Sequence, residues 1–201
     1  TLPVKGEGGM LQYDQKRLYP HLYKPKKTPS LVTVPSFGYL MLRGEGDSND
    51  VLYETAVSVL FSLSQAIKMT ASPKEYAIAP LECIWDTAEV ENKSPWIWVA
   101  MISQPDWVTS QMVEQVREQV AFKLGRIAKE AFFLKQTDGL CVTMLHTGSY
   151  EHIAQSFSQM EAFAAQQNLA RINSSHREIY LSNPRKTDQE KLETVLRFSV
   201  S

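Results

Sequence analysis

The amino-acid sequence predicts an α+β protein built from two copies of a β-α-β-β unit, which together form one antiparallel sheet with a central cleft. The first observation is that segments with strand and helix periodicity alternate along the chain in this order. The second is that the order repeats, with a Met-Leu pair before the first long helix, at Met41, and before the last, at Met144. The third is the length of 201 residues, which suits a single domain with a substantial core.

The first half of the chain is expected to begin with a strand over residues 31–43 that Pro35 and Gly38 interrupt. Apolar side chains then recur at helical spacing over residues 51–69, from Leu52 onward. Two strands and a second helix follow, over residues 76–85, 95–102 and 109–129, with a charged turn at residues 86–93 between the strands.

The second half repeats this order. The dipeptide Asp138-Gly139 suits a tight turn, so we expect a hairpin of two strands over residues 130–136 and 140–145. A helix over residues 150–167 and two strands over residues 177–181 and 194–200 complete the second unit.

Composition narrows the possible partners. Hydrophobic residues make up 43% of the chain and charged residues 21%, as in ordinary globular proteins. The net charge of −1 gives no general attraction to nucleic acid or to an anionic membrane, so we expect neither as a partner, and no residue pattern identifies a protein partner. No window approaches the roughly 18 unbroken apolar residues of a membrane span.

The cysteines and histidines indicate a reducing compartment and no bound metal. Cys83 and Cys141 lie alone in apolar stretches, which favours buried free thiols and a cytoplasmic location. The four histidines form no zinc-binding pattern, so we expect no metal and no cofactor. The glycine-rich residues before Met10 look like the remnant of an expression tag; we expect residues 1–17 to be a tail and residues 18–201 the domain.

The segment around Glu178 is the sharpest local signal. Alternation along a strand places His176, Glu178 and Tyr180 on one face and Arg177 and Ile179 on the other. In one interpretation Ile179 faces the core and Glu178 faces water. In the other, Glu178 lies at the floor of a cleft beside the two aromatic side chains, where its protonation would respond to burial and to a phenol or a cationic ligand.

Tryptophans are concentrated in one stretch of the chain. Trp85, Trp96, Trp98 and Trp107 lie close together in sequence, and Trp96 and Trp98 share one strand face. Two indoles on one face either pack in the core or form a wall of a ligand cleft, and the sequence leaves both possibilities open.

A strand-to-helix turn runs from His146 to Tyr150. Gly148 supplies conformational freedom and Ser149 can cap the helix, which explains the turn without any function. Tyr150 can still project across the strand ends, where ligand sites tend to lie. The sequence contains no serine elbow and no phosphate-cradling glycine loop.

These residues resemble the GyrI-like small-molecule-binding family, whose fold is shared with the effector domains of multidrug-sensing regulators. The resemblance runs from about Leu18 to the C-terminus, in the stand-alone form, and rests on residues 80–85, 96–98, 146–150, 176–185 and 190–197. It implies a tandem repeat, a central cleft lined by aromatic residues, a key acid at Glu178, and xenobiotic binding. One branch of the family hydrolyses DNA-alkylating natural products that carry a strained cyclopropane.

Two functions are compatible with this resemblance. In the first, Trp85, Trp96, Trp98 and Tyr180 stack on a flat electrophile, Glu178 activates water, and Tyr150 stabilises the developing oxyanion, with His146 and His176 as further ligand contacts. In the second, the same residues bind a cationic drug-like molecule without turnover, through Glu178 and cation–π contacts.

Overall fold

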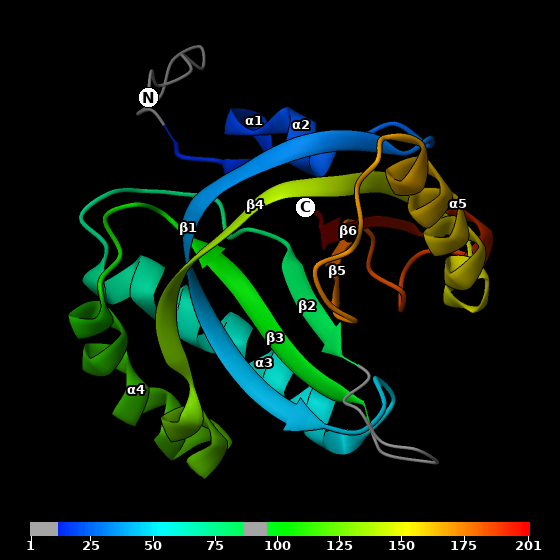
Figure 1. Ribbon diagram of the computed structural model, residues 1–201. Helices are drawn as coiled ribbons and strands as arrows, with labels where there is room; N and C mark the ends of the chain where they lie inside the picture. The colour runs from blue at the N-terminus through cyan, green and yellow to red at the C-terminus, as the bar shows by residue number, and fades with distance from the viewer. Residues whose placement is uncertain (1–11, 87–95) are drawn as a thin grey trace.

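The computed structural model describes residues 12–86 and 96–201, which form an α+β fold, as the sequence predicts. The strands of these residues form a single antiparallel sheet that closes into a barrel in the order β1-β3-β2-β5-β6-β4 (Figure 1). The strands are β1 (Ser30–Glu45), β2 (Leu81–Asp86), β3 (Ile97–Gln104), β4 (Phe132–Thr147), β5 (His176–Tyr180) and β6 (Glu193–Ser199). The α-helices are α1 (Gln15–Leu18), α2 (Pro20–Tyr23), α3 (Val51–Ala66), α4 (Ser110–Leu124) and α5 (Ile153–Gln166).

The two long strands β1 and β4 pair with each other, and this pairing overturns the predicted hairpin. Residues 30–41 of β1 lie antiparallel to residues 132–143 of β4, so both arms of the expected hairpin pair with one strand instead of with each other. The predicted turn at Asp138-Gly139 is therefore wrong, and so is the predicted interruption of the first strand at Pro35, because β1 is continuous.

Pro35 in β1 and Asp138-Gly139 in β4 mark the point at which each strand switches which of its faces points into the barrel. Val34 and Phe37 lie three residues apart, yet both are buried in the same core cluster. The partner of this step in β4 is Asp138-Gly139, where Gly139 has φ of 68°. Pro35 is tolerated at this position because residues 30–37 of β1 pair only with β4. The other edge of this part of β1 therefore has no ladder hydrogen bonds that a proline would remove.

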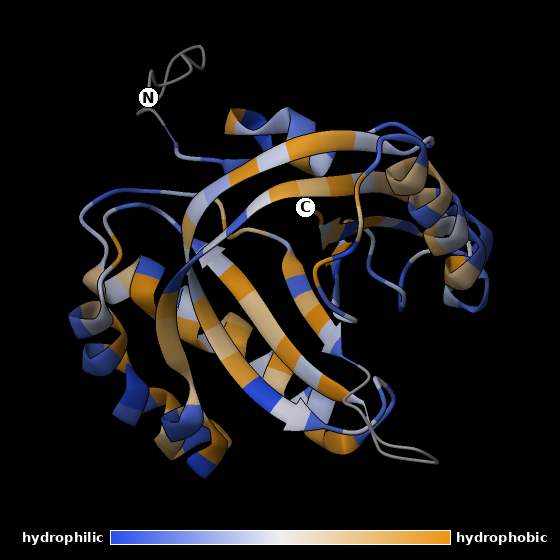
Figure 2. Cartoon of the chain, viewed as in Figure 1, coloured by the Kyte–Doolittle hydropathy of each residue, from blue (hydrophilic) through white to orange (hydrophobic). Residues whose placement is uncertain are grey.

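Helices cover the outside of the barrel on two sides. Helices α3 and α4 pack on β1, β2 and β3, and α5 packs on β4 and β6 (Figure 1). A third cluster fills the barrel interior with residues from β1, β3, β4, β5 and β6. Figure 2 shows β3 as an almost unbroken apolar strand, as expected for a strand buried on both faces.

The interior cluster is closed by the short N-terminal helices. Leu22 and Tyr23 of α2 are 2% exposed and belong to the interior cluster. Gln15 of α1 is buried too, and its side-chain oxygen accepts a hydrogen bond from Ser103 Oγ at 2.9 Å. Residues before the first strand are thus an integral part of the packed barrel.

The other predicted elements need smaller corrections. The first long helix is α3, which continues as a π-helical turn over Ile67–Ala71. Helix α4 begins after its cap Thr109 but ends at Leu124, because Gly125 has φ of 93°, and a 3₁₀ turn over Arg126–Glu130 follows. The strand predicted over residues 76–85 comprises only β2, and the predicted turn at residues 86–93 lies, from residue 87 on, outside the described residues.

Within the two described stretches, no helix is both long and apolar enough to cross a membrane. Both cysteines are free and buried.

Candidate functional site

Strand β5 presents a carboxylate to the outer face of the sheet, between the helices α3 and α5. Arg177 and Ile179 point into the barrel and are buried, so His176, Glu178 and Tyr180 point outward. Glu178 does not reach open water, because its side chain is only 13% exposed. Ile179 faces the interior core, as the first interpretation of the sequence had it, whereas the burial of Glu178 agrees with the second.

Both oxygens of Glu178 accept hydrogen bonds from neighbours on the same face. The Tyr180 hydroxyl donates to Oε2 at 2.6 Å, and His176 Nε2 lies 3.0 Å from Oε1 and donates to it. The Tyr180 oxygen in turn accepts a hydrogen bond from Trp85 Nε1 at 3.0 Å. A continuous chain of donors therefore runs from the Trp85 indole to the carboxylate, and it suits an ionised Glu178.

Tyr180 remains a donor over the whole working pH range. Burial, together with the negative charge of Glu178, raises the pKa of the Tyr180 phenol well above its ordinary value. The same two causes raise the pKa of the Cys83 thiol, whose residue pairs with Glu178 across β2 and β5. Cys83 therefore stays protonated and is a poor nucleophile.

Aromatic side chains surround this carboxylate. Trp85 and Trp98 are register partners on β2 and β3, and Tyr53 of α3 packs on both, at centroid distances of 5.5 and 5.3 Å. Trp96 lies edge-on to Trp85 at 6.3 Å and to His176 at 6.5 Å. It is 42% exposed, whereas Trp98 is 1% exposed, so Trp96 is the indole that a ligand can reach.

Two aromatic residues of the cluster were missed by the sequence interpretation. Tyr53 comes from α3 and Phe157 from α5, and the Phe157 ring lies 4.3 Å from the His176 ring. The helical spacing predicted that the buried stripe of the first helix begins at Leu52, but Leu52 is 48% exposed and Tyr53 is buried. The spacing of Tyr53 from the buried Ala56 and Leu60 is the signal that identifies it.

Tyr150 lies at the edge of the cluster. It begins a 3₁₀ turn over Tyr150–His152, is 39% exposed, and packs edge-on to Tyr180 at a centroid distance of 6.1 Å. Burial and the charge of Glu178 raise the pKa of the Tyr150 phenol. Tyr150 is therefore a protonated, partly accessible hydrogen-bond donor.

His146 makes its polar contacts with the turn that carries Tyr150 and with helix α5, not with the members of the cluster. Its Nε2 donates to the Ser149 carbonyl oxygen at 3.0 Å, and its Nδ1 accepts from Ser156 Oγ at 2.8 Å. Both ring nitrogens are thus used within the chain, and the imidazole ties the turn that carries Tyr150 to helix α5. We call the set of Glu178, His176, Tyr180, Tyr150, Trp85, Trp96, Trp98, Tyr53 and Phe157 the aromatic–carboxylate cluster.

Among the described residues, no group of three or more histidine, cysteine, aspartate or glutamate side chains is arranged to hold a metal ion. The polar groups of the aromatic–carboxylate cluster are a carboxylate, phenols and an imidazole, next to aromatic rings.

Comparison with known proteins identifies a family model and several similar structures. The model of the GyrI-like small molecule binding domain matches residues 27–200. A structure described as a hydrolase from Listeria innocua has a TM-score of 0.86 and 29% sequence identity, with 94% of this chain and 100% of that chain covered. A search of curated proteins found no match.

More distant structures share the fold. The C-terminal domain of EcmrR has a TM-score of 0.56 and 15% identity, covering 87% of this chain and 97% of that one. SAV2435 bound to tetraphenylphosphonium has a TM-score of 0.51 and 10% identity, covering 86% and 93%.

Proposed function

The chain belongs to the GyrI-like small-molecule-binding domain family, and from that premise we propose that it binds a flat, apolar small molecule at the aromatic–carboxylate cluster. The observation that carries this proposal is the position of the Glu178 carboxylate, which is 13% exposed, bonded to Tyr180 and His176, and ringed by aromatic side chains. An apolar surface with a few fixed polar groups is the usual composition of a small-molecule site.

The exposed members of the cluster define how a ligand would be held. Trp96 and Tyr150 are about two-fifths exposed and supply the faces that a flat ring can stack on. Tyr53 and Trp98 are buried behind Trp85 and fix its orientation. The buried rings thus form a rigid support, and Trp96 and Tyr150 are the two aromatic side chains that a ligand can contact.

We further propose that the protein hydrolyses electrophiles bearing a strained cyclopropane conjugated to a dienone, which makes it a detoxifying enzyme. Glu178 would take a proton from water while the water oxygen bonds to the ring methylene. The cyclopropane C–C bond would break, its electron pair would move to the dienone carbonyl oxygen, and that oxygen would gain a proton to form a phenol. We assign the role of donor to this oxygen to Tyr150, whose raised pKa keeps it protonated. The structure described as a hydrolase from Listeria innocua, at 29% identity, supports a hydrolytic reaction but does not identify the substrate.

The test is turnover of a spirocyclopropyl dienone alkylator, with the ring-opened, water-added product followed by mass spectrometry. Wild-type protein is expected to form many equivalents of product. Glu178→Gln keeps the size of the side chain but cannot act as a base, so we expect a loss of about 10²–10⁴-fold in kcat. Recovery of the bound compound intact from wild-type protein would contradict hydrolysis while leaving the binding proposal standing.

A second candidate is sequestration of a lipophilic cation without turnover. Its support is an ionised carboxylate beside aromatic faces, where cation–π contacts contribute roughly 0.5–2 kcal/mol each. The discriminating measurement is the affinity for tetraphenylphosphonium in wild type and in Glu178→Gln. Sequestration predicts tight binding that weakens in the variant, whereas a site for neutral electrophiles predicts weak binding in both.

The internal repeat, the extent of the domain, the location and the partners of the protein are also proposed. We propose that the strand and helix order β1-α3-β2-β3 and β4-α5-β5-β6 reflects two copies of one unit meeting at the cluster. We also propose that residues 18–201 form the body of the domain, to which α1 adds the buried side chain of Gln15. We propose that the protein acts in the cytoplasm, where its two buried free thiols are stable, and that nucleic acid is not its partner.

A further inference from the structure

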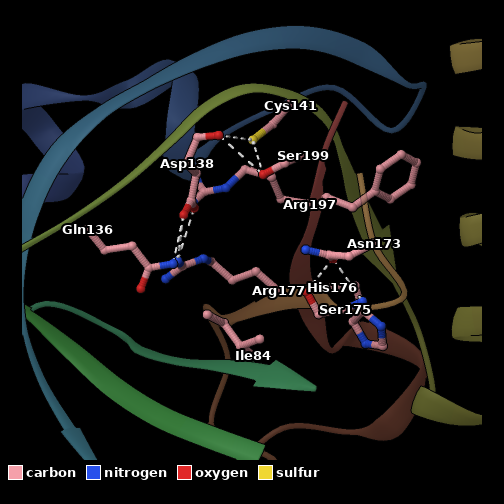
Figure 3. A pocket seen from close by; sticks show the side chains of 11 residues that line it. Ile84, Gln136, Asp138, Cys141, Asn173, Ser175, His176, Arg177, Arg197 and Ser199 are labelled. Carbon is pink, nitrogen blue, oxygen red and sulfur yellow. Dashed lines mark hydrogen bonds and ion pairs between the residues drawn. The ribbon is translucent and has the colours of Figure 1, made fainter. Parts of the chain in front are cut away.

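A polar cavity opens where Arg177 of β5 and Arg197 of β6 point into the barrel (Figure 3). Its volume is about 100 Å³, too small for the flat ligand proposed above but sufficient for a few heavy atoms. Its polar lining includes the guanidiniums of Arg177 and Arg197, the carboxylate of Asp138, the amides of Gln136 and Asn173, and the His176 ring. Asn173 is exposed and Arg197 is 2% exposed, so the cavity leads from the surface into the barrel.

Two buried arginines meet the buried Glu82 and the largely buried Asp138, whose carboxylate itself lines the cavity. Arg177 pairs with Glu82 at 2.7 Å and with Asp138 at 3.0 Å, and Arg197 pairs with Asp138 at 3.0 Å. Asp138 also accepts a hydrogen bond from Gln136 Nε2 at 3.0 Å. The formal charges of the two arginines and two acids therefore cancel, and both carboxylates are already supplied with donors.

Some hydrogen-bond donors of the residues that line the cavity, in contrast, have no acceptor in the described part of the chain. Arg197 Nε is buried and has no hydrogen-bond partner within the described residues, although a guanidinium carries five N–H groups. The Asn173 side-chain oxygen accepts from Ser175 N and Ser175 Oγ, which leaves its amide nitrogen as a donor. Figure 3 shows that nitrogen turned toward the cavity. Arg197 on the cavity wall and Asn173 at the surface end of the cavity thus each keep an unused donor.

We propose that this cavity is a second binding site and that its ligand is a small oxyanion of the carboxylate or phosphate type. A planar guanidinium with an unused Nε–H is the group best suited to hold such oxygens, and the Asn173 amide would add a second contact at the mouth. Because the surrounding network is electrically neutral, the bound anion is not repelled by an excess of acid. The site does not depend on the function proposed for the aromatic–carboxylate cluster.

The experiment is a titration of the whole protein with sodium phosphate and, separately, with sodium acetate, each against sodium chloride at equal ionic strength. Amide chemical shifts of residues 173–177 and 197–199 are the readout. We expect at least one oxyanion to produce saturable shifts there that chloride does not produce. Saturation by phosphate alone identifies a phosphate-type ligand, and saturation by acetate identifies a carboxylate.

Variants link any binding to the cavity. Arg197→Lys keeps the positive charge but removes the fork, and we expect a loss of affinity of at least tenfold. Asn173→Ala removes an exposed amide, which should leave the fold intact, and we expect a loss of about threefold to tenfold. Arg185→Lys, at an exposed arginine paired with Glu54, is the matched control and should bind as wild type does.

The proposal would be overturned by shifts no larger than those with chloride, which would mean a cavity filled by water alone. It would also be overturned by unchanged affinity in both Asn173→Ala and Arg197→Lys. If Arg197→Lys does not fold, Asn173→Ala and Arg185→Lys still decide the question. Glu178→Gln should bind the oxyanion normally, so this result is independent of the hydrolysis experiment.

Discussion

Glu178 is a carboxylate that is largely withdrawn from water, with its side chain 13% exposed, while its polar atoms keep partners. Its two oxygens accept hydrogen bonds from Tyr180 and His176, which offset the loss of hydration. The aromatic rings around it exclude bulk solvent and so strengthen its interaction with any polar group of a ligand. This combination suits both a general base and a partner for a cation.

Asp138 is the residue whose charge matters most inside the barrel. Burial opposes its ionisation, but the guanidiniums of Arg177 and Arg197 outweigh this effect and lower its pKa. We predict that Asp138→Asn decreases the free energy of unfolding at pH 7 by about 3–5 kcal/mol, because removing one partner leaves buried charge uncompensated. Urea denaturation of both proteins measures this difference.

The stability difference between wild type and Asp138→Asn is expected to depend on pH in one direction. A carboxylate with a lowered pKa in the folded state contributes stability above its unfolded pKa of about 3.9 and loses it as the pH falls through the folded value. The difference between wild type and Asp138→Asn should therefore be constant near neutrality and shrink below about pH 4. A difference that grows on acidification would contradict the assignment.

Part of the aromatic–carboxylate cluster could be predicted from the sequence. The part contributed by one strand follows from local alternation, whereas the part contributed by helices depends on tertiary packing. Strand alternation alone places His176, Glu178 and Tyr180 on one face, and it also predicts that Trp96 and Trp98 share a face. It cannot say which helix covers that face, so Tyr53 and Phe157 appeared only with the tertiary structure. The pattern likewise did not show that the ring nitrogens of His146 are bonded within the chain.

At the scale of elements, β1 and β4 show why turn-like dipeptides can mislead. Asp138-Gly139 and Pro35 both favour a break when each strand is considered alone. Their long antiparallel pairing, from Ser30 with Thr143 to Met41 with Phe132, outweighs the local preference, and the chain changes face without reversing. The α+β class and the order of the long elements follow from periodicity, whereas barrel closure depends on long-range pairing that periodicity does not encode.

The contact between β1 and β3 depends on one glycine. Gly44 pairs with Trp98, and a Cβ added at Gly44 would overlap the Trp98 indole. We predict that Gly44→Ala shifts Trp98 and decreases the free energy of unfolding by about 1–3 kcal/mol, as overpacked sites do. Urea denaturation and the tryptophan emission spectrum are the measurements, and an unchanged spectrum with wild-type stability would contradict this packing.

At the scale of the whole molecule, β5 separates two different environments. Its outward residues belong to the aromatic–carboxylate cluster, and its inward residue Arg177 belongs to the charged network inside the barrel. A single five-residue strand thus contributes to both proposed sites. Of the outward residues of β5, His176 also lines the interior cavity, whereas Glu178 and Tyr180 do not.

Barrel closure also depends on the N-terminal helices. Leu22 is 2% exposed in the interior cluster, so we predict that Leu22→Ala decreases the free energy of unfolding by about 2–5 kcal/mol. Leu18→Ala, at a half-buried leucine of the neighbouring helix α1, is the control and should cost less. Equal and small effects of both changes in urea denaturation would show that these helices are not part of the cooperative unit.

Small-molecule binding at the aromatic–carboxylate cluster can be measured through Trp96, its most exposed indole. Trp96→Ala and Phe122→Ala both remove an exposed aromatic ring, the first at the cluster and the second on α4, where Phe122 is 94% exposed. The probe is the ring-opened, water-added product of the spirocyclopropyl dienone, titrated by calorimetry. We predict that Trp96→Ala weakens binding by about tenfold, since an aromatic pair contributes roughly 0.5–1.5 kcal/mol beyond its buried area. Phe122→Ala should bind as wild type does, and equal affinities for all three proteins would contradict the location of the site.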